Sequence, residues 1–257
     1  MSGTLFLVPN TLDFGIEGEQ ADLQEVLPLG VIRTAARLTH WVAENGKTTR
    51  AFLKRVNAVV PLALALQQLS IEELPRPGKG GARPSAHGGD QAAVERLLAP
   101  LHAGHDLGLI SEAGLPAVAD PGAALVRAAH AGGLRVVPLA GPSSLLLALA
   151  ASGLNGQSFT FVGYLPIDNA DRAARIRELE SHSRRLKQTQ LMIETPYRNE
   201  ALLGGLLDHL NASTELSVSC GLTLAGGWTR SASVASWRAA PRDVPKDIPA
   251  VFALLAR

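Results

Sequence analysis

Cysteine is almost absent from this sequence, since Cys220 is the only one in 257 residues. A single cysteine cannot form a disulfide within the chain or supply a cluster of thiolate ligands, so we expect no metal site and a reducing, cytoplasmic location. Aromatic residues make up only 4% of the chain. That fraction leaves little material for a surface that binds single strands by stacking bases on aromatic rings.

Long apolar runs and a strong excess of one charge are missing as well. No stretch of about 18 apolar residues is free of charged and turn residues, so we expect no membrane span. Residues 1–10 have no basic segment ahead of a long apolar one, which argues against a secretory signal. The net charge of +1 is lower than is usual for a dedicated nucleic-acid-binding domain. The hydrophobic fraction of 46% is typical of a globular protein, and the length suits one large domain or two small ones.

Short apolar segments alternate with segments of helical spacing in the first half of the chain. We expect strands at 4–8, 30–36, 106–110 and 134–139, and helices at 20–27, 46–56, 61–69, 90–101 and 122–131. This alternation predicts a parallel sheet with helices on its faces. Asp90 is the expected N-cap of the helix at 90–101, and the Gly- and Pro-rich segment 75–90 is expected to be a loop.

The second half is richer in strand. Strands are expected at 159–166, 189–195, 215–224 and 247–256, with a helix that ends at Gly153 and further helices at 168–188 and 199–210. This pattern predicts a mixed sheet. The chain is therefore expected to fold as two α/β domains, 1–141 with a parallel sheet and 142–257 with a mixed sheet.

Three loops rich in Gly, Pro or Ser follow expected strands: "LVPNTLDFG" (7–15), "SEAGLPAVADPG" (111–122) and "PLAGPSS" (138–144). The carboxyl ends of parallel strands are where α/β sheets bind ligands, Gly lets the backbone approach a ligand closely, and Pro fixes its course. Ser143 or Ser144 is expected to cap the following helix. None of the loops matches GxGxxG or a P-loop. We expect one composite cleft; stiff turns without function are the alternative.

Taken in order, these loops resemble those of the tetrapyrrole methylase family of S-adenosylmethionine-dependent methyltransferases. The branch they resemble most is the bacterial 16S ribosomal RNA 2′-O-ribose cytidine methyltransferases, which carry "SDAGTPGISDPG" and "VVPLPGPSA" where this chain has "SEAGLPAVADPG" and "VVPLAGPSS". "LVPN", "FVGYLP" and "IETPYR" are similar to that branch's "VPTP", "FxGFLP" and "YESPHR". The resemblance implies two α/β domains with the cofactor cleft between them, S-adenosylmethionine as cofactor, a homodimer, and ribosomal RNA or the small subunit as partner.

The resemblance also implies which residues contact the cofactor. They belong to the three loops and to three segments of the second half: Pro9, Ser111, Gly114, Leu115, Pro116, Val118, Ser143, Ser144, Met192, Cys220, Gly221, Leu222, Pro249 and Ala250.

The departures from that branch fall on the side of the substrate. Its "AEDTR" reads "AENGK" at 43–47, so that Lys47 stands for Arg, and Lys does not replace Arg at a bidentate site. A His/Asn/Glu cluster of the branch reads "SAHGGD" here, and the first loop lacks "GNL". The methyl acceptor is therefore open between a ribose 2′-hydroxyl of ribosomal RNA, a tetrapyrrole-like or other small metabolite, and none at all in a non-catalytic homologue that only binds the cofactor.

Methyl transfer from a sulfonium is an in-line displacement that depends mainly on positioning, and a hydroxyl acceptor also benefits from a base. The candidate bases are Glu44, Glu112 and Glu194. A structural role in the turn is the alternative for Glu112, and an ion pair with Arg198 is the alternative for Glu194.

Three further residues are candidates for contacting the substrate: Lys47, Arg50 and His87. Lys47 and Arg50 could hold a phosphate or a carboxylate, and a solvated helix face is the equally open alternative. His87 lies in the expected loop at 75–90. His102 and His105 are three residues apart but have no third candidate ligand near them, so we expect no metal there.

Overall fold

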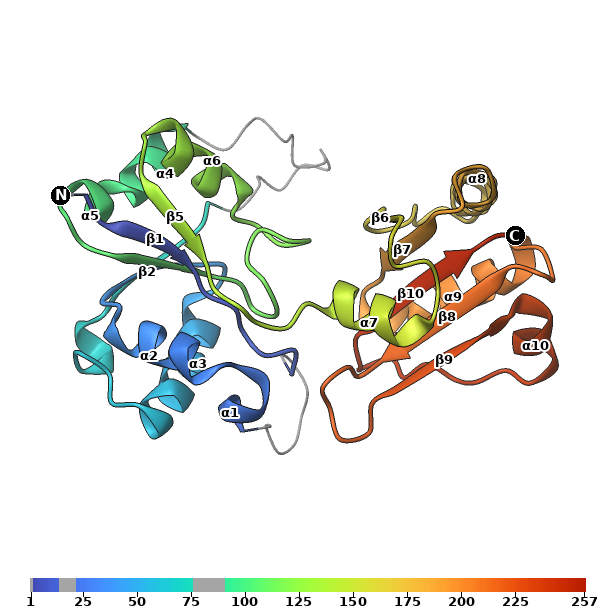
Figure 1. The fold of residues 1–257 in the computed structure, drawn as a ribbon, viewed down its shortest axis with the longest axis horizontal. Coiled ribbons are helices and arrows are strands. Elements are labelled where there is room, and N and C mark those ends of the chain that lie inside the picture. Colours follow the sequence, from blue (N-terminus) through green and yellow to red (C-terminus); the bar gives the residue numbers. More distant parts are fainter. Residues whose placement is uncertain (1, 14–21, 76–90) are drawn as a thin grey trace. The chain divides into compact units, whose positions relative to one another are not determined.

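The computed structural model describes residues 2–13, 22–75 and 91–257. The chain forms two compact units, each with its own five-stranded sheet (Figure 1). Of the described residues, those up to Pro142 belong to the first unit and Ser143–Arg257 to the second. No helix in the described part of the chain is long and apolar enough to cross a membrane.

The sheet of the first unit is parallel throughout. Its strands, in spatial order, are β3 (Ser70–Glu73), β2 (His40–Ala43), β4 (Leu107–Ile110), β1 (Thr4–Leu7) and β5 (Arg135–Pro138). In register, Leu5 lies between Leu107 and Val136. Because all five strands run in one direction, the loops that follow them leave from one edge of the sheet, as ligand sites of α/β proteins require.

Helices cover both faces of this sheet (Figure 1). On one face lie α1 (Leu23–Val26), α2 (Leu29–Arg37) and α3 (Gly46–Val59), and on the other lie α4 (Gln91–Leu97), α5 (Ala99–His102) and α6 (Ala123–Ala131). Trp41 anchors the first core against Phe52 of α3, and Leu109 anchors the second against Leu125 of α6. Both cores bury aliphatic side chains on the sheet, which is the main stabilising contribution.

Residues 30–36, expected as the second strand, instead form most of α2. Val31, Ile32, Ala35 and Ala36 are all buried, and their spacing is that of one helix face rather than of a strand. Pro28 is the N-cap residue of this helix, a position where its missing N–H costs no helical hydrogen bond. The second strand is β2, a short segment around Trp41 in which three of the four residues are buried.

Two helix predictions need a similar correction. The segment 61–69 contains only a single 3₁₀ turn, Leu66–Gln68, before β3 begins. The segment 90–101 forms two helices, α4 and α5, with the break at Leu98. Pro100 sits in the first turn of α5, where its missing N–H costs no hydrogen bond. Asp90, expected to be an N-cap, and most of the expected loop at 75–90 lie outside the described residues.

The second unit contains a mixed sheet in the order β6 (Phe159–Phe161), β7 (Thr189–Ile193), β10 (Ala250–Leu255), β8 (Glu215–Cys220) and β9 (Trp228–Ser233). β6 and β7 are parallel, and the other neighbours are antiparallel. The predicted fold class, a parallel-sheet unit followed by a mixed-sheet unit, is confirmed. β9 was not predicted, because its alternation of Thr, Arg and Ser gives little apolar signal.

Alternate residues of the strands in the second unit face two helix layers. Met192 and Phe252 face α8 (Asn169–Leu186), α9 (Asn199–His209) and α10 (Val234–Ala239), whereas Leu191 and Val251 face α7 (Ser144–Ser152). As predicted, α7 ends at Gly153, which takes the left-handed conformation with φ +68°.

Candidate functional site

The three loops expected to form a ligand site converge at the carboxyl edge of the parallel sheet. Gly141 of the third loop packs so closely on Pro9 of the first that an added Cβ would lie 2.2 Å from the Pro9 Cβ. At Gly114 of the second loop, a Cβ would lie 3.4 Å from Leu12 and 3.6 Å from the Pro142 carbonyl oxygen. Within the first unit, the loops therefore form one continuous surface.

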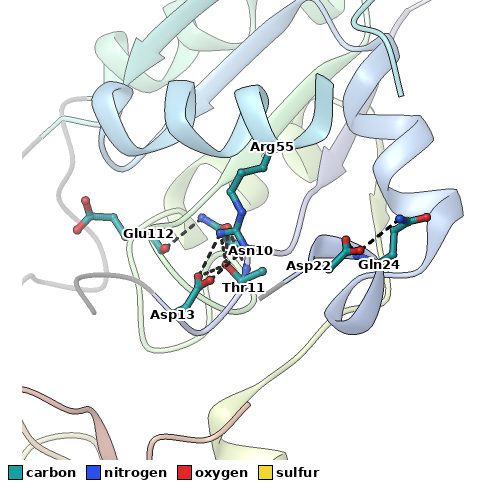
Figure 2. A network of polar contacts seen from close by, with 7 residues as sticks. All are labelled: Asn10, Thr11, Asp13, Asp22, Gln24, Arg55 and Glu112. Atoms are coloured by element: carbon teal, nitrogen blue, oxygen red, sulfur yellow. Dashed lines mark hydrogen bonds and ion pairs between the residues drawn. The ribbon is translucent and has the colours of Figure 1, made fainter. Parts of the chain in front are cut away.

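Asn10 joins the first loop to the second (Figure 2). Its backbone N–H donates to the Gly114 carbonyl at 2.8 Å, and its side-chain amide donates to the carbonyls of Ser111 at 3.1 Å and Glu112 at 3.0 Å. Its side-chain oxygen accepts from the Thr11 N–H at 2.9 Å. The amide nitrogen and oxygen of the Asn10 side chain are thus both hydrogen-bonded, and they hold the start of the second loop against the first.

Arg55 of α3 holds the first loop from the other side (Figure 2). Its guanidinium forms a bidentate ion pair with Asp13, with N–O distances of 3.0 and 3.3 Å, and donates to the Thr11 hydroxyl at 3.2 Å. The Thr11 hydroxyl in turn donates to Asp13. A bidentate pair fixes geometry as well as charge. This network was not predicted, because Arg55 and Asp13 are distant in sequence and Arg55 belongs to none of the three loops.

The backbone of the second loop has unusual conformations. Four of its residues have positive φ angles, namely Gly114, Ala117, Ala119 and Gly122. The two alanines pay a steric cost there that glycine does not. Such strain persists only where the surroundings enforce it, and it clusters at ligand sites. Gly122 is the N-cap residue of α6, where no side chain caps the helix.

The structure brings together two of the three candidate bases. Glu44 follows β2 and Glu112 follows β4, and the Glu112 N–H donates to the Glu44 carboxylate at 3.1 Å. The Glu112 carboxylate accepts from the Thr48 hydroxyl of α3 at 3.4 Å. Both acids therefore also hold neighbouring elements together, which is the structural role left open for Glu112.

A third acid of this region, Asp120, was missed in the sequence. Burial raises its pKa, and the nearby charges of Glu44 and Glu112 raise it further, to about 7, although Ser111 acts in the opposite direction. The signal available was the single Asp of "ADPG" in the same loop, but nothing in the sequence says that the charges of Glu44 and Glu112 would raise its pKa.

The start of α3, where the sequence departs from the ribosomal RNA branch, keeps its helix cap. Asn45 is the N-cap and accepts from the Lys47 N–H at 2.9 Å, and Glu73 of β3 accepts from the Gly46 N–H at 2.8 Å. Asn and Asp serve equally well at this position. Lys47 and Arg50 are exposed on the first turns of the helix. His87 lies outside the described part of the chain.

The other loop residues expected to contact the cofactor differ in how exposed their side chains are. Val118 is 44% exposed, whereas Pro116 and Ser111 are buried and Leu115 is partly buried. Ser143 occupies the N-cap position of α7 and is buried, but its side chain makes no capping hydrogen bond. Ser143 is therefore at the predicted N-cap position, but its hydroxyl does not cap the helix. Ser144 is the first residue of the helix.

In the second unit, the residues implied by the resemblance form one group around two strand ends. Cys220 is paired with Ala250, and the Gly221 N–H donates to the Pro249 carbonyl at 3.0 Å. Pro249 is exposed. Leu222 packs against the apolar cluster under α7.

Two of these implied residues have no side chain to offer to a ligand. Met192 and Cys220 are 0% and 1% exposed, with side chains in the core against α8, α9 and α10. Only their main chains could contribute. The third candidate base, Glu194, forms the alternative ion pair, since it accepts from Arg198 at 2.6 Å and from the Thr195 N–H at 2.7 Å.

Together, the parallel sheet, the mixed sheet and the converging loops define an α/β protein of two units, with three loops gathered at the carboxyl edge of the sheet in its first unit. The family model of the tetrapyrrole (corrin/porphyrin) methylases matches residues 31–236. The chain belongs to this family.

Relatives with curated names point to one branch. The chain is 42% identical over 209 residues to the ribosomal RNA small subunit methyltransferase I of Pseudomonas aeruginosa, a match that covers 80% of this chain and 61% of that one. It is 38% identical over 131 residues to the protein of the same name from Mesorhizobium japonicum, covering 51% and 43%. The matches thus span between about two fifths and three fifths of these relatives.

A solved structure supports the fold alone. The cobalamin biosynthetic enzyme cobalt precorrin-4 methyltransferase matches with a TM-score of 0.56 at 11% identity, covering 98% of this chain and 94% of that one.

Proposed function

We propose that this chain transfers a methyl group from S-adenosylmethionine to a ribose 2′-hydroxyl of small-subunit ribosomal RNA. The observation that carries the proposal is the convergence of the three loops at the edge of the parallel sheet, in a methylase-family chain that is 42% identical to a named ribosomal RNA methyltransferase. The family resemblance further supports a cytoplasmic homodimer.

The loops suit a nucleoside ligand. Between Gly114 and Ala119 the second loop has no charged side chain. In our proposal, the N–H and C=O groups of its strained backbone form hydrogen bonds with the uncharged polar groups of the nucleoside. The buried Ser111 hydroxyl has no hydrogen-bond partner in the described part of the chain, and buried polar groups are normally satisfied, here by a ligand in our proposal. When bound, S-adenosylmethionine supplies a methyl group on a sulfonium centre.

In this proposal the methyl donor is bound by residues of the loops and of the second unit. Pro9, Gly114, Leu115, Pro116 and Val118 contact it from the first unit, with Ser111. Ser143, Ser144 and the group of Met192, Cys220, Gly221, Leu222, Pro249 and Ala250 supply further contacts, through the main chain at Met192 and Cys220.

Lys47 and Arg50 are proposed to hold the acceptor. Both are exposed on the first two turns of α3, close in sequence to Glu44 at the end of β2. Two cations on an exposed helix start can bind phosphate, and such contacts weaken with salt.

Calorimetric titration with S-adenosylmethionine and S-adenosylhomocysteine tests the donor site. We expect saturable binding to the wild type and none to Gly114→Trp, since Gly114 touches both neighbouring loops. Gly133→Trp is the matched control, because Gly133 has nearly the same φ, +65° against +63°, and open space around it. No binding of either ligand to the wild type would overturn the proposal.

The acceptor is tested by transfer of tritiated methyl to isolated 30S subunits that lack the modification. Label in the ribosomal RNA, resistant to alkali at one 2′-O-methylated linkage, is the expected result. Label only in a small-molecule extract would instead favour a metabolite as the acceptor, and donor binding without any transfer would favour a non-catalytic homologue.

A further inference from the structure

The solvent face of α8, in the second unit, carries a group of cations towards its C-terminal end. The helix packs on the mixed sheet through a buried face that includes Leu179, which is 1% exposed. Arg177, Arg184 and Arg185 are exposed, and Lys187 is the exposed C-cap residue. We call these four side chains the α8 basic surface.

The acids closest to this surface in the sequence are already bound to other groups. Glu178 forms an ion pair with Arg175 at 2.6 Å. Glu180 is buried and accepts from the Asn211 backbone N–H at 2.8 Å and from the Asn211 side chain, whereas Arg184 lies 4.0 Å from it. These are the only two acids between residues 172 and 189. The second half of α8 therefore has no carboxylate left over to neutralise the basic surface.

The arrangement differs from that of a helix face laced with ion pairs. Such a face places acids four residues from its cations, but Ser181 stands four residues from both Arg177 and Arg185. Neither of these two guanidinium groups forms an ion pair within the described part of the chain. Arg184 is oriented, since its Nε–H donates to the Arg257 carbonyl oxygen at 3.0 Å, and 49% of its side chain remains exposed.

The dipole of the helix accounts for only part of this charge. Cations stabilise the last turn of a helix, and the effect falls off beyond that turn. Arg177 stands nine residues before Leu186, the last residue of α8, so the dipole does not explain it. Lys187 has the left-handed conformation, with φ +50°, at a position where glycine is the usual residue. A cation is therefore found there in spite of a steric cost.

We propose that the α8 basic surface binds the phosphate backbone of the ribosomal RNA. The inference rests on the proposed function and adds a contact with RNA in the second unit. Exposed arginine and lysine side chains bind phosphates with release of counterions, which gives affinity without base specificity. The surface then contributes to affinity for the small subunit and takes no part in the transfer of methyl.

The test measures the affinity of the full chain for unmodified 30S subunits, and for protein-free 16S ribosomal RNA, at several salt concentrations. The double variant Arg177→Gln/Arg185→Gln should bind both at least about tenfold more weakly. The slope of log Kd against log salt concentration should fall by about two, because two phosphate contacts are lost. In single-turnover methyl transfer, the subunit concentration at half-saturation should rise with the loss of affinity.

A matched control removes the same charge elsewhere. Arg33→Gln/Arg127→Gln replaces two exposed arginines of the first unit. We expect this variant to keep the wild-type salt slope. An equal fall of the slope in the two double variants would show that only the net charge matters, and would overturn the proposal.

Lys187→Gly separates binding from folding. Glycine relieves the left-handed backbone, so the free energy of unfolding, measured in urea, should not fall. Affinity for the 30S subunit should nevertheless fall, and the salt slope should decrease by about one. A variant that is less stable but binds with the wild-type affinity would show that Lys187 has a structural role only.

The outcomes distinguish the two proposals. Wild-type affinity and salt slope in Arg177→Gln/Arg185→Gln would overturn the role of the surface and leave the methyltransferase proposal intact. Weaker binding to 30S subunits with unchanged binding to protein-free RNA would indicate a ribosomal protein as the partner, and would overturn the assignment to RNA. A wild-type protein that neither binds nor methylates the subunit or its RNA would overturn both proposals.

Discussion

Gly141 and Pro9 are in contact across two loops that are 132 positions apart in the sequence, and the contact leaves no space for a side chain at Gly141. A Cβ there would lie 2.2 Å from the Cβ and 2.4 Å from the Cγ of Pro9. The Pro9 ring is rigid and cannot turn away. The convergence of the loops therefore depends on glycine at this position.

Gly141→Ala should separate the first and third loops. We expect it to lower the free energy of unfolding by about 1–3 kcal/mol, the usual cost of overpacking, and to weaken binding of S-adenosylmethionine at least about tenfold, or 1.4 kcal/mol. Urea unfolding and calorimetry measure the two effects. Gly156→Ala is the control, since its Cβ would meet no atom within 4 Å. Equal affinities of the two variants would contradict the prediction.

Arg55→Met should destabilise the first loop. It leaves the Asp13 carboxylate, whose side chain is only 8% exposed, without its bidentate partner, and uncompensated buried charges cost about 3–5 kcal/mol. Arg37→Met is the matched control: it breaks an ion pair with Asp106 in which Arg37 is 51% exposed, and exposed pairs contribute about 1 kcal/mol or less. Denaturant unfolding of both variants measures the loss in the free energy of unfolding. Similar losses in the two variants would contradict the role of the Arg55–Asp13 ion pair in holding the first loop.

Asn10→Ala should loosen the start of the second loop. It leaves the carbonyls of Ser111 and Glu112 without the amide that satisfies them, and an unsatisfied buried group costs about 1–3 kcal/mol. Hydrogen exchange at residues 111–120 should speed up, and affinity for the donor should fall. Asn57→Ala, which removes an exposed side chain of α3, should leave exchange in this loop unchanged. Unaltered exchange in Asn10→Ala would show that the amide does not hold the loop.

Stability should depend on pH through Asp120. Its pKa rises from 3.8 in ordinary surroundings to about 7 on folding, so between pH 4 and 7 the folded protein keeps a proton that the unfolded chain has lost. The stability that Asp120 contributes is therefore full below its ordinary pKa of 3.8 and is lost as the pH rises to about 7. Urea unfolding at pH 4.5, 6, 7 and 8 should show Asp120→Asn gaining on the wild type as the pH rises. A constant difference between the two proteins would contradict this.

The convergence of the three loops could be predicted from the sequence, because Gly, Pro and Ser at the ends of strands are chosen for local backbone reasons. The three loops do converge within the first unit, and Glu44, which follows β2, meets Glu112 of the second loop; their roles as bases stay predictions. Arg55 and Asp120 were not predicted, since their importance comes from partners far away in the sequence. The Arg55 ion pair joins residues 42 positions apart, and the pKa of Asp120 is raised by Glu44, which follows a different strand of the sheet.

The sequence by itself determined the alternation of strands and helices, the change from a parallel to a mixed sheet, and the family, because periodic burial and turn chemistry are local properties. The tertiary structure decided which short apolar segment became the second strand. The prediction of a strand at 30–36 was wrong, because these residues form α2, whose buried face packs in the same core as Trp41. The tertiary structure also decided that Met192 and Cys220 lie in the core and that burial and the charges of two acids raise the pKa of Asp120. Burial and electrostatic coupling are properties of groups brought together in space, and no local pattern records them.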